Sequence, residues 1–100
     1  MQKWSEHDYP EEFDALPEER QALLLDWIDA NLIKIQSYNT RHTSYGLKHL
    51  VHLKNCDNSY FTNGQFKGAM LKSGFSVKDP NAFNWVFNVS QRSPAFHQKK

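Results

Sequence analysis

The chain has 100 residues, of which 39% are hydrophobic and 14% aromatic, and its formal net charge at pH 7 is +1. This length predicts one domain with one core, and no apolar run approaches the roughly 20 residues that cross a bilayer. The N-terminus lacks the apolar stretch of a secretory signal, and the lone cysteine, Cys56, fits a reducing compartment. We therefore expect a cytoplasmic protein that is not bound to a membrane.

The charges are distributed unevenly along the chain. Residues 1–30 contain nine acids and two bases, whereas residues 31–100 contain ten bases and two acids. A basic segment of this kind favours a polyanionic partner such as nucleic acid, because each neutralised phosphate releases counterions. The alternatives are a protein partner, or an acidic segment that folds back and screens the basic one.

The first 14 residues (1–14) are predicted to form an acidic, irregular arm. We expect the single domain to span residues 15–92 and a basic, flexible tail to follow at residues 93–100. Acids alternate in the arm with aromatic residues that could pin it to the domain or anchor a protein partner: Trp4, Tyr9 and Phe13.

Two longer helices are predicted after the arm. The first should run from about residue 17 to about residue 34, with Pro17 at its first position and a broad apolar face. The second should be capped by Thr43 or Ser44 and continue to about Asn55. Its buried stripe is expected to contain Leu47, Leu50 and Val51, and its opposite face Tyr45, Lys48, His49 and His52.

The third helix has the clearest start and stop signals. Thr62 with Gln65 matches a capping box. Gly74 stands where a left-handed residue commonly follows a helix, and Phe75 after it could contact Met70. The helix is therefore predicted to span residues 63–73.

A short β-hairpin is predicted to follow the third helix. The segments 76–78 and 85–89 could pair, because the second alternates apolar and polar residues. Three helices and then a hairpin is the element order of a winged helix-turn-helix domain. The predicted fold class is therefore α+β, mainly helical and winged-helix-like.

In such a domain the third helix would meet DNA, and duplex DNA is favoured here. Gly64 and Gly68 leave a strip without side chains, which would face either a phosphate backbone or the first helix of the same domain. Asn63 and Gln65, at the helix start, are candidates for base contacts. The candidates for phosphate contacts are Arg41, Lys48, Lys67, Lys72 and Lys78.

Three runs of sequence, at residues 41–49, 62–70 and 84–88, resemble a family of short uncharacterised proteins from phages and mobile elements of Gram-positive bacteria. The likeness covers roughly residues 38–92 and excludes the acidic arm. That family has no assigned reaction, so the resemblance implies no catalytic residue. It implies a mobile-element setting, in which small DNA-binding regulators and small inhibitors of host enzymes are both common.

Metal binding and catalysis are less favoured by the sequence. His49, His52 and Cys56 have the spacing of metal ligands, but zinc needs a fourth ligand, and solvated histidines explain them more simply. Cys56 has no orienting acid except Asp57, and nothing builds an oxyanion hole. We therefore predict a non-enzymatic nucleic-acid-binding module without metal or cofactor. The alternative is a protein-binding inhibitor or adaptor that uses the arm.

Overall fold

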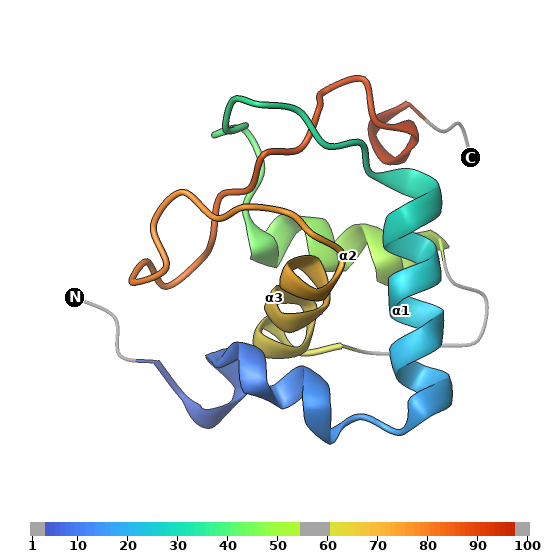
Figure 1. The fold of residues 1–100 in the computed structure, drawn as a ribbon, viewed down its shortest axis with the longest axis vertical. Helices are drawn as coiled ribbons and strands as arrows, with labels where there is room; N and C mark the ends of the chain where they lie inside the picture. Colours follow the sequence, from blue (N-terminus) through green and yellow to red (C-terminus); the bar gives the residue numbers. More distant parts are fainter. Residues whose placement is uncertain (1–3, 55–60, 98–100) are drawn as a thin grey trace.

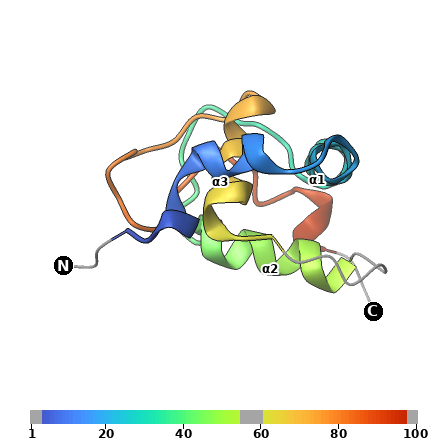
Figure 2. The ribbon, with the colours of Figure 1, turned by 90° about the horizontal axis from the view of Figure 1, so that it is seen from below.

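The computed structural model describes residues 4–54 and 61–97. Within these ranges the helices are α1 (Glu18–Asn31), α2 (Ser44–Lys54) and α3 (Asn63–Lys72), and the 3-10 helices are η1 (Glu6–Asp8), η2 (Pro10–Ala15) and η3 (Pro94–Phe96). Figure 1 shows α3 at the centre, α1 beside it, and η1 and η2 at one end of the molecule. Seen from below in Figure 2, α2 and the η1–η2 segment both lie against α3. No helix in the described ranges is long and apolar enough to cross a membrane.

Helix α3 has both of its predicted ends, although it stops one residue earlier than predicted. The Thr62 side chain accepts a hydrogen bond from the Gln65 amide at 3.1 Å, and the Gln65 side chain accepts one from the Thr62 amide at 2.9 Å. This confirms the capping box. At the other end Gly74 has φ +90°, and the Phe75 amide donates to the Met70 carbonyl at 3.0 Å. Local signals therefore fix this helix.

Helix α1 ends at Asn31, whereas the predicted helix continued to about residue 34. Leu32 is already extended, with φ −122° and ψ 135°. The backbone of Ile33 has other partners: its amide donates to the Ser93 hydroxyl at 2.8 Å, and its carbonyl accepts from the Ser90 amide at 2.7 Å. Because these contacts come from distant parts of the chain, they override the helical periodicity.

The predicted β-hairpin is wrong, and with it the α+β, winged-helix-like fold class. Among the described residues the structure has helices but no strand. The segments 76–78 and 85–89 do meet, but only through an isolated antiparallel bridge between Val77 and Phe87. The fold is therefore mainly helical, with irregular segments where the wing was expected.

The hairpin does not form because the backbone of its second segment is shared among several neighbours. The Ser44 amide donates to the Trp85 carbonyl at 2.7 Å, and the Asn39 amide donates to the Phe87 carbonyl at 3.0 Å. Trp85 and Phe87 are also buried in the core. On the edge that faces segment 76–78 the ladder stops after the bridge, because the Ser76 amide donates to the Asn88 side chain at 2.7 Å while the Asn88 carbonyl accepts from the Ile35 amide at 3.0 Å.

One hydrophobic core draws side chains from the whole described chain. Phe13 of η2 and Ala95 of η3 are both buried in it, so the predicted arm and tail each contribute. The arm is also more regular than expected, since Ser5 and Asp8 form a capping box at η1. The division at residues 14 and 92 stays a prediction. The other buried apolar residues are Leu24, Ile28, Leu32, Leu47, Val51, Phe61, Phe66, Ala69, Met70, Phe75, Trp85, Phe87 and Val89.

Candidate functional site

The glycine strip of α3 faces the N-terminal segment of the same chain. A Cβ atom added to Gly64 would lie against the Tyr9 carbonyl oxygen, and one added to Gly68 would lie against the Pro10 carbonyl oxygen. No partner could approach this strip without displacing η1 and η2. The strip therefore serves internal packing, although its neighbour is the predicted arm and not the first helix.

Lys67 lies in an aromatic site inside the protein. Its side chain is 0% exposed. Its Nζ lies 3.7 Å from the ring centroid of Trp4 and 4.9 Å from that of Trp85, and it donates a hydrogen bond to the Asp8 carbonyl at 3.0 Å. Burial lowers the pKa of Lys67 to about 8, although the Asp8 carboxylate acts in the opposite direction. Lys67 therefore holds the N-terminal segment on α3 and is not available to a phosphate.

Three more of the predicted DNA contacts, Gln65, Asn63 and Lys48, are engaged or buried. The Gln65 side chain is part of the capping box, so its oxygen already accepts a hydrogen bond. Asn63 is 6% exposed, and Lys48 on α2 is 3% exposed. Burial lowers the pKa of Lys48. The sequence placed Lys48 on the outer face of its helix, whereas the structure places it inside.

The three aromatic residues predicted as protein anchors have different environments. Phe13 is 2% exposed and belongs to the core, and Trp4 is partly buried against the Lys67 ammonium. Tyr9 is 47% exposed. Of these three, only Tyr9 offers its ring to a partner.

The exposed bases gather on what we name the loop layer, residues 33–43 and 73–93. Hydrogen bonds hold its extended stretches side by side: the Ile35 amide donates to the Asn88 carbonyl at 3.0 Å, and the Lys78 amide donates to the Val86 carbonyl at 2.9 Å. Figure 1 shows stretches 33–43 and 85–93 of this layer at the end of the molecule away from η1 and η2. These two stretches lie away from the acidic end, whereas Pro80 and Asn81 of the layer line a pocket together with Glu11.

The loop layer contains four bases and one acid, Asp79. The exposed bases are Lys34, Arg41, Lys78 and Arg92, and Lys72 at the end of α3 is also exposed. The structure therefore brings the predicted residues Arg41 and Lys78 into one layer. It adds Lys34 and Arg92, which the sequence prediction missed because it placed Lys34 at the end of a helix and Arg92 at the edge of the domain.

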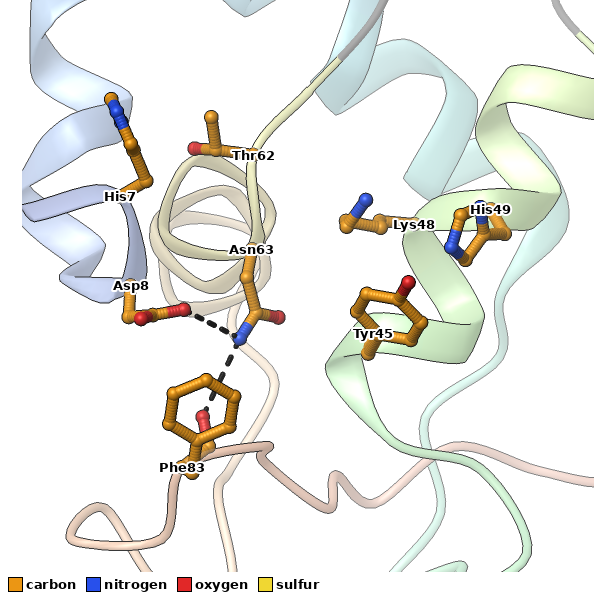
Figure 3. A pocket seen from close by; sticks show the side chains of 8 residues that line it. All are labelled: His7, Asp8, Tyr45, Lys48, His49, Thr62, Asn63 and Phe83. Carbon is orange, nitrogen blue, oxygen red and sulfur yellow. Dashed lines mark hydrogen bonds between the residues drawn. The ribbon is translucent and has the colours of Figure 1, made fainter. Parts of the chain in front are cut away.

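A separate cavity of about 650 Å³ lies between η1, α2 and the start of α3 (Figure 3). Helix η1 contributes His7 and Asp8 to its wall, and α2 contributes Tyr45, Lys48 and His49. Two residues that the sequence proposed for DNA contact, Lys48 and Asn63, thus meet in a pocket. Thr62, Asn63 and Phe83 complete the described lining.

The Asn63 side chain is the best-defined polar group of this pocket. Its Nδ2 atom donates to Asp8 Oδ1 at 3.3 Å, to the Phe83 carbonyl at 3.4 Å and to Asn84 Oδ1 at 3.1 Å. Its Oδ1 atom is buried and has no hydrogen-bond partner. Burial opposes ionisation of Asp8, but hydrogen bonds from Ser5 and Asn63 and the charge of Lys67 lower its pKa on balance.

No group of three potential metal ligands is found among the described residues. His49 belongs to the pocket wall, while the side chains of His52 and Cys56, the other two residues of the proposed ligand set, lie outside the described part. Comparisons with protein-family models, curated proteins and solved structures gave no match. The resemblance to phage and mobile-element proteins therefore stays a prediction.

Proposed function

We propose that the protein is a non-enzymatic nucleic-acid-binding module that contacts duplex DNA through the loop layer. The observation that supports this proposal is the segregation of exposed charge. The bases of the loop layer and Lys72 are solvent-exposed, and the layer has a single acid. A surface of this kind favours phosphates because each contact releases counterions into solution.

The acidic residues at one end of the molecule would orient an approaching polyanion. Residues 4–31 contain nine acids and one base, and the most acidic part of this stretch, at η1, η2 and the start of α1, lies away from stretches 33–43 and 85–93 (Figure 1). A polyanion would be repelled by that end and attracted by the other. Such an arrangement orients a charged partner during approach and raises the association rate.

The loop layer also offers neutral groups between its bases. Tyr38 is exposed, as are Ile33 and Ile35, while the Asn88 side chain is occupied by hydrogen bonds to the backbone of Ile35 and Ser76. A tyrosine hydroxyl such as that of Tyr38 commonly adds a hydrogen bond to phosphate beside such cationic side chains. Phosphate contacts by lysines and arginines from separate irregular stretches favour binding to the DNA backbone over reading of base edges by one helix.

Fluorescence anisotropy with a labelled duplex of about 20 base pairs tests the proposal. With four or five bases in contact with phosphates, we expect log affinity to fall with log salt at a slope of about −4. Arg41→Gln should weaken binding about fivefold at low salt and reduce the slope by about 0.9. The fold should persist, because the Arg41 side chain is exposed.

Ala22→Glu provides the matched control, because it also lowers the net charge by one but lies on the exposed face of α1. This variant should change the affinity less than about twofold, since screening limits charges at that distance. Equal losses in the two variants would show that net charge, and not the loop layer, governs binding. Affinity that does not depend on salt would exclude the phosphate contacts altogether.

A further inference from the structure

The orientation of the Asn63 amide is fixed by its surroundings. Its nitrogen faces three acceptors, which come from Asp8, Phe83 and Asn84. Turning the amide over would place its oxygen against these acceptors, so this orientation is the only one with satisfied hydrogen bonds. The oxygen then points into the cavity, toward the side of Tyr45 and Lys48, as Figure 3 shows. A buried acceptor without a partner on the protein calls for a donor, which a ligand in the cavity can supply.

The groups around this oxygen restrict what that ligand can be. Tyr45 and Phe83 both line the cavity, so it offers aromatic surface to a flat ring. The Lys48 ammonium lies 5.0 Å from the centroid of the Tyr45 ring and carries three N–H donors. The cavity thus combines an acceptor, a cationic donor and aromatic walls, and its volume of about 650 Å³ is within the range of small-ligand sites.

We propose that this cavity binds a planar heterocycle that carries a ring N–H beside a carbonyl group, the edge shared by uracil, thymine and guanine. Asn63 Oδ1 accepts the hydrogen bond from the ring N–H. Lys48 donates to the neighbouring carbonyl oxygen, and Tyr45 stacks on the ring. Nucleobases are recognised in this way when they are unpaired and their hydrogen-bonding edges are free.

This site goes beyond the proposed function, because none of the exposed bases of the loop layer lines the cavity. The heterocycle can be a free nucleoside or a base within a single strand, and both present the same edge. A flat ring with an N–H donor is the common requirement. The two sources differ in the sugar–phosphate chain that they bring, which a comparison of ligands can detect.

Titrations of the full chain, followed by NMR chemical shifts, test the proposal with uridine, 3-methyluridine and a six-residue oligouridylate. Uridine should shift the Asn63 side-chain NH₂ signals and the Tyr45 ring signals in a saturable way. The N-methyl group of 3-methyluridine removes the donor, so binding should be at least about tenfold weaker. This comparison needs no variant, and the fold is therefore not at risk.

Tyr45→Ala should weaken uridine binding about tenfold, since stacking of a base on an aromatic ring is lost. Tyr45 is 52% exposed, and Tyr38→Ala is the matched control because Tyr38 is an exposed tyrosine outside the cavity. Tighter binding of the oligouridylate than of uridine supports a base within a strand. Binding of uridine alone supports a free nucleoside.

Three outcomes would overturn the proposal. The first is the absence of saturable shifts for uridine and oligouridylate up to about 10 mM. The second is equal affinity for uridine and 3-methyluridine, and the third is equal effects of Tyr45→Ala and Tyr38→Ala. The heterocycle site and the duplex interface are tested independently. Arg41→Gln should leave uridine binding unchanged, and Tyr45→Ala should leave duplex affinity unchanged.

Discussion

The N-terminal segment and the loop layer use their polar groups in opposite ways. The N-terminal segment, residues 4–15, packs tightly on α3: its backbone fills the glycine strip, Phe13 enters the core, and the Asp8 carbonyl accepts a hydrogen bond from Lys67. The loop layer satisfies its backbone internally and leaves its bases in solvent. Burial therefore separates the lysines that maintain the fold from those that are available to a partner.

The largest effect is expected from removing the aromatic side chain that ties the N-terminal segment to the core. Phe13→Ala should lower the free energy of unfolding by about 3–5 kcal/mol, because it leaves a cavity at a buried site. Tyr38→Ala, in the loop layer, should cost less than about 0.5 kcal/mol. Chemical denaturation measures both. If both variants lowered the free energy of unfolding by similarly small amounts, the N-terminal segment would be a loosely attached arm.

A smaller loss is expected from filling the glycine strip. A methyl group at Gly68 would collide with backbone atoms of Pro10, so Gly68→Ala should destabilise the protein by about 1–3 kcal/mol. Gly46→Ala on α2 is the control, since nothing lies within 4 Å of its added Cβ atom. Helix propensity predicts that this control gains up to about 1 kcal/mol. Stabilisation by both substitutions, measured by thermal and chemical unfolding, would mean that the N-terminal segment does not pack on α3.

Lys67 should make stability depend on pH in the alkaline range. Its pKa is about 8 in the folded protein and near 10.5 in the unfolded chain. Between these values the unfolded chain binds more protons, so stability rises with pH. From pH 7 to pH 9 the free energy of unfolding should increase by about 1 kcal/mol from this group.

Lys67→Met keeps the length of the side chain and removes the titration, so it isolates this contribution. The variant should be less stable at pH 7, because the cation–π contacts and the hydrogen bond to Asp8 are lost. The gap between wild type and variant should widen from pH 7 to pH 9. A gap that is constant or narrows would contradict a lowered pKa for the buried ammonium.

The smallest effect is expected from the acids far from the loop layer. Neutralising two exposed acids at the start of α1, as in the double variant Glu18→Gln and Glu19→Gln, should change duplex affinity less than about twofold at physiological salt. The reason is that screening extends only about 8 Å, whereas the longest dimension of the molecule is 35 Å. An increase of several fold in anisotropy titrations would show instead that the acidic segment screens the basic surface.

The sequence predicted those parts of the fold that depend on neighbouring residues. The ends of α3 are defined by contacts within a few residues, which involve Thr62, Gln65 and Gly74. Such local signals can be recognised from the sequence without a tertiary structure. Alternation at residues 85–89 correctly indicated burial of Trp85 and Phe87, but burial alone does not make a strand. Which segment pairs with residues 85–89 depends on the topology of the fold. The alternation of apolar and polar residues does not reveal it.

The candidate site was less predictable because it depends on contacts between distant residues. The sequence predicted Lys67 and Lys48 to be surface bases. In the structure Lys67 is enclosed by Trp4 and Trp85, and Lys48 lies in the wall of a pocket. Asn63 was noticed for its place at a helix start, which is why it reaches the cavity. Its orientation depends on Asp8 and Phe83, and no periodicity in the sequence connects these residues.

The most direct test of the loop-layer interface is an NMR titration of the ¹⁵N-labelled protein with unlabelled duplex DNA. We expect the largest amide shifts in residues 33–43, 76–78 and 86–92, and little change in α3 or in residues 4–15. That result would place the duplex on the exposed bases and away from the glycine strip. Dominant shifts in residues 63–68 together with residues 8–13 would contradict it, because they would mean that the N-terminal segment leaves α3 and that the helix itself receives the DNA.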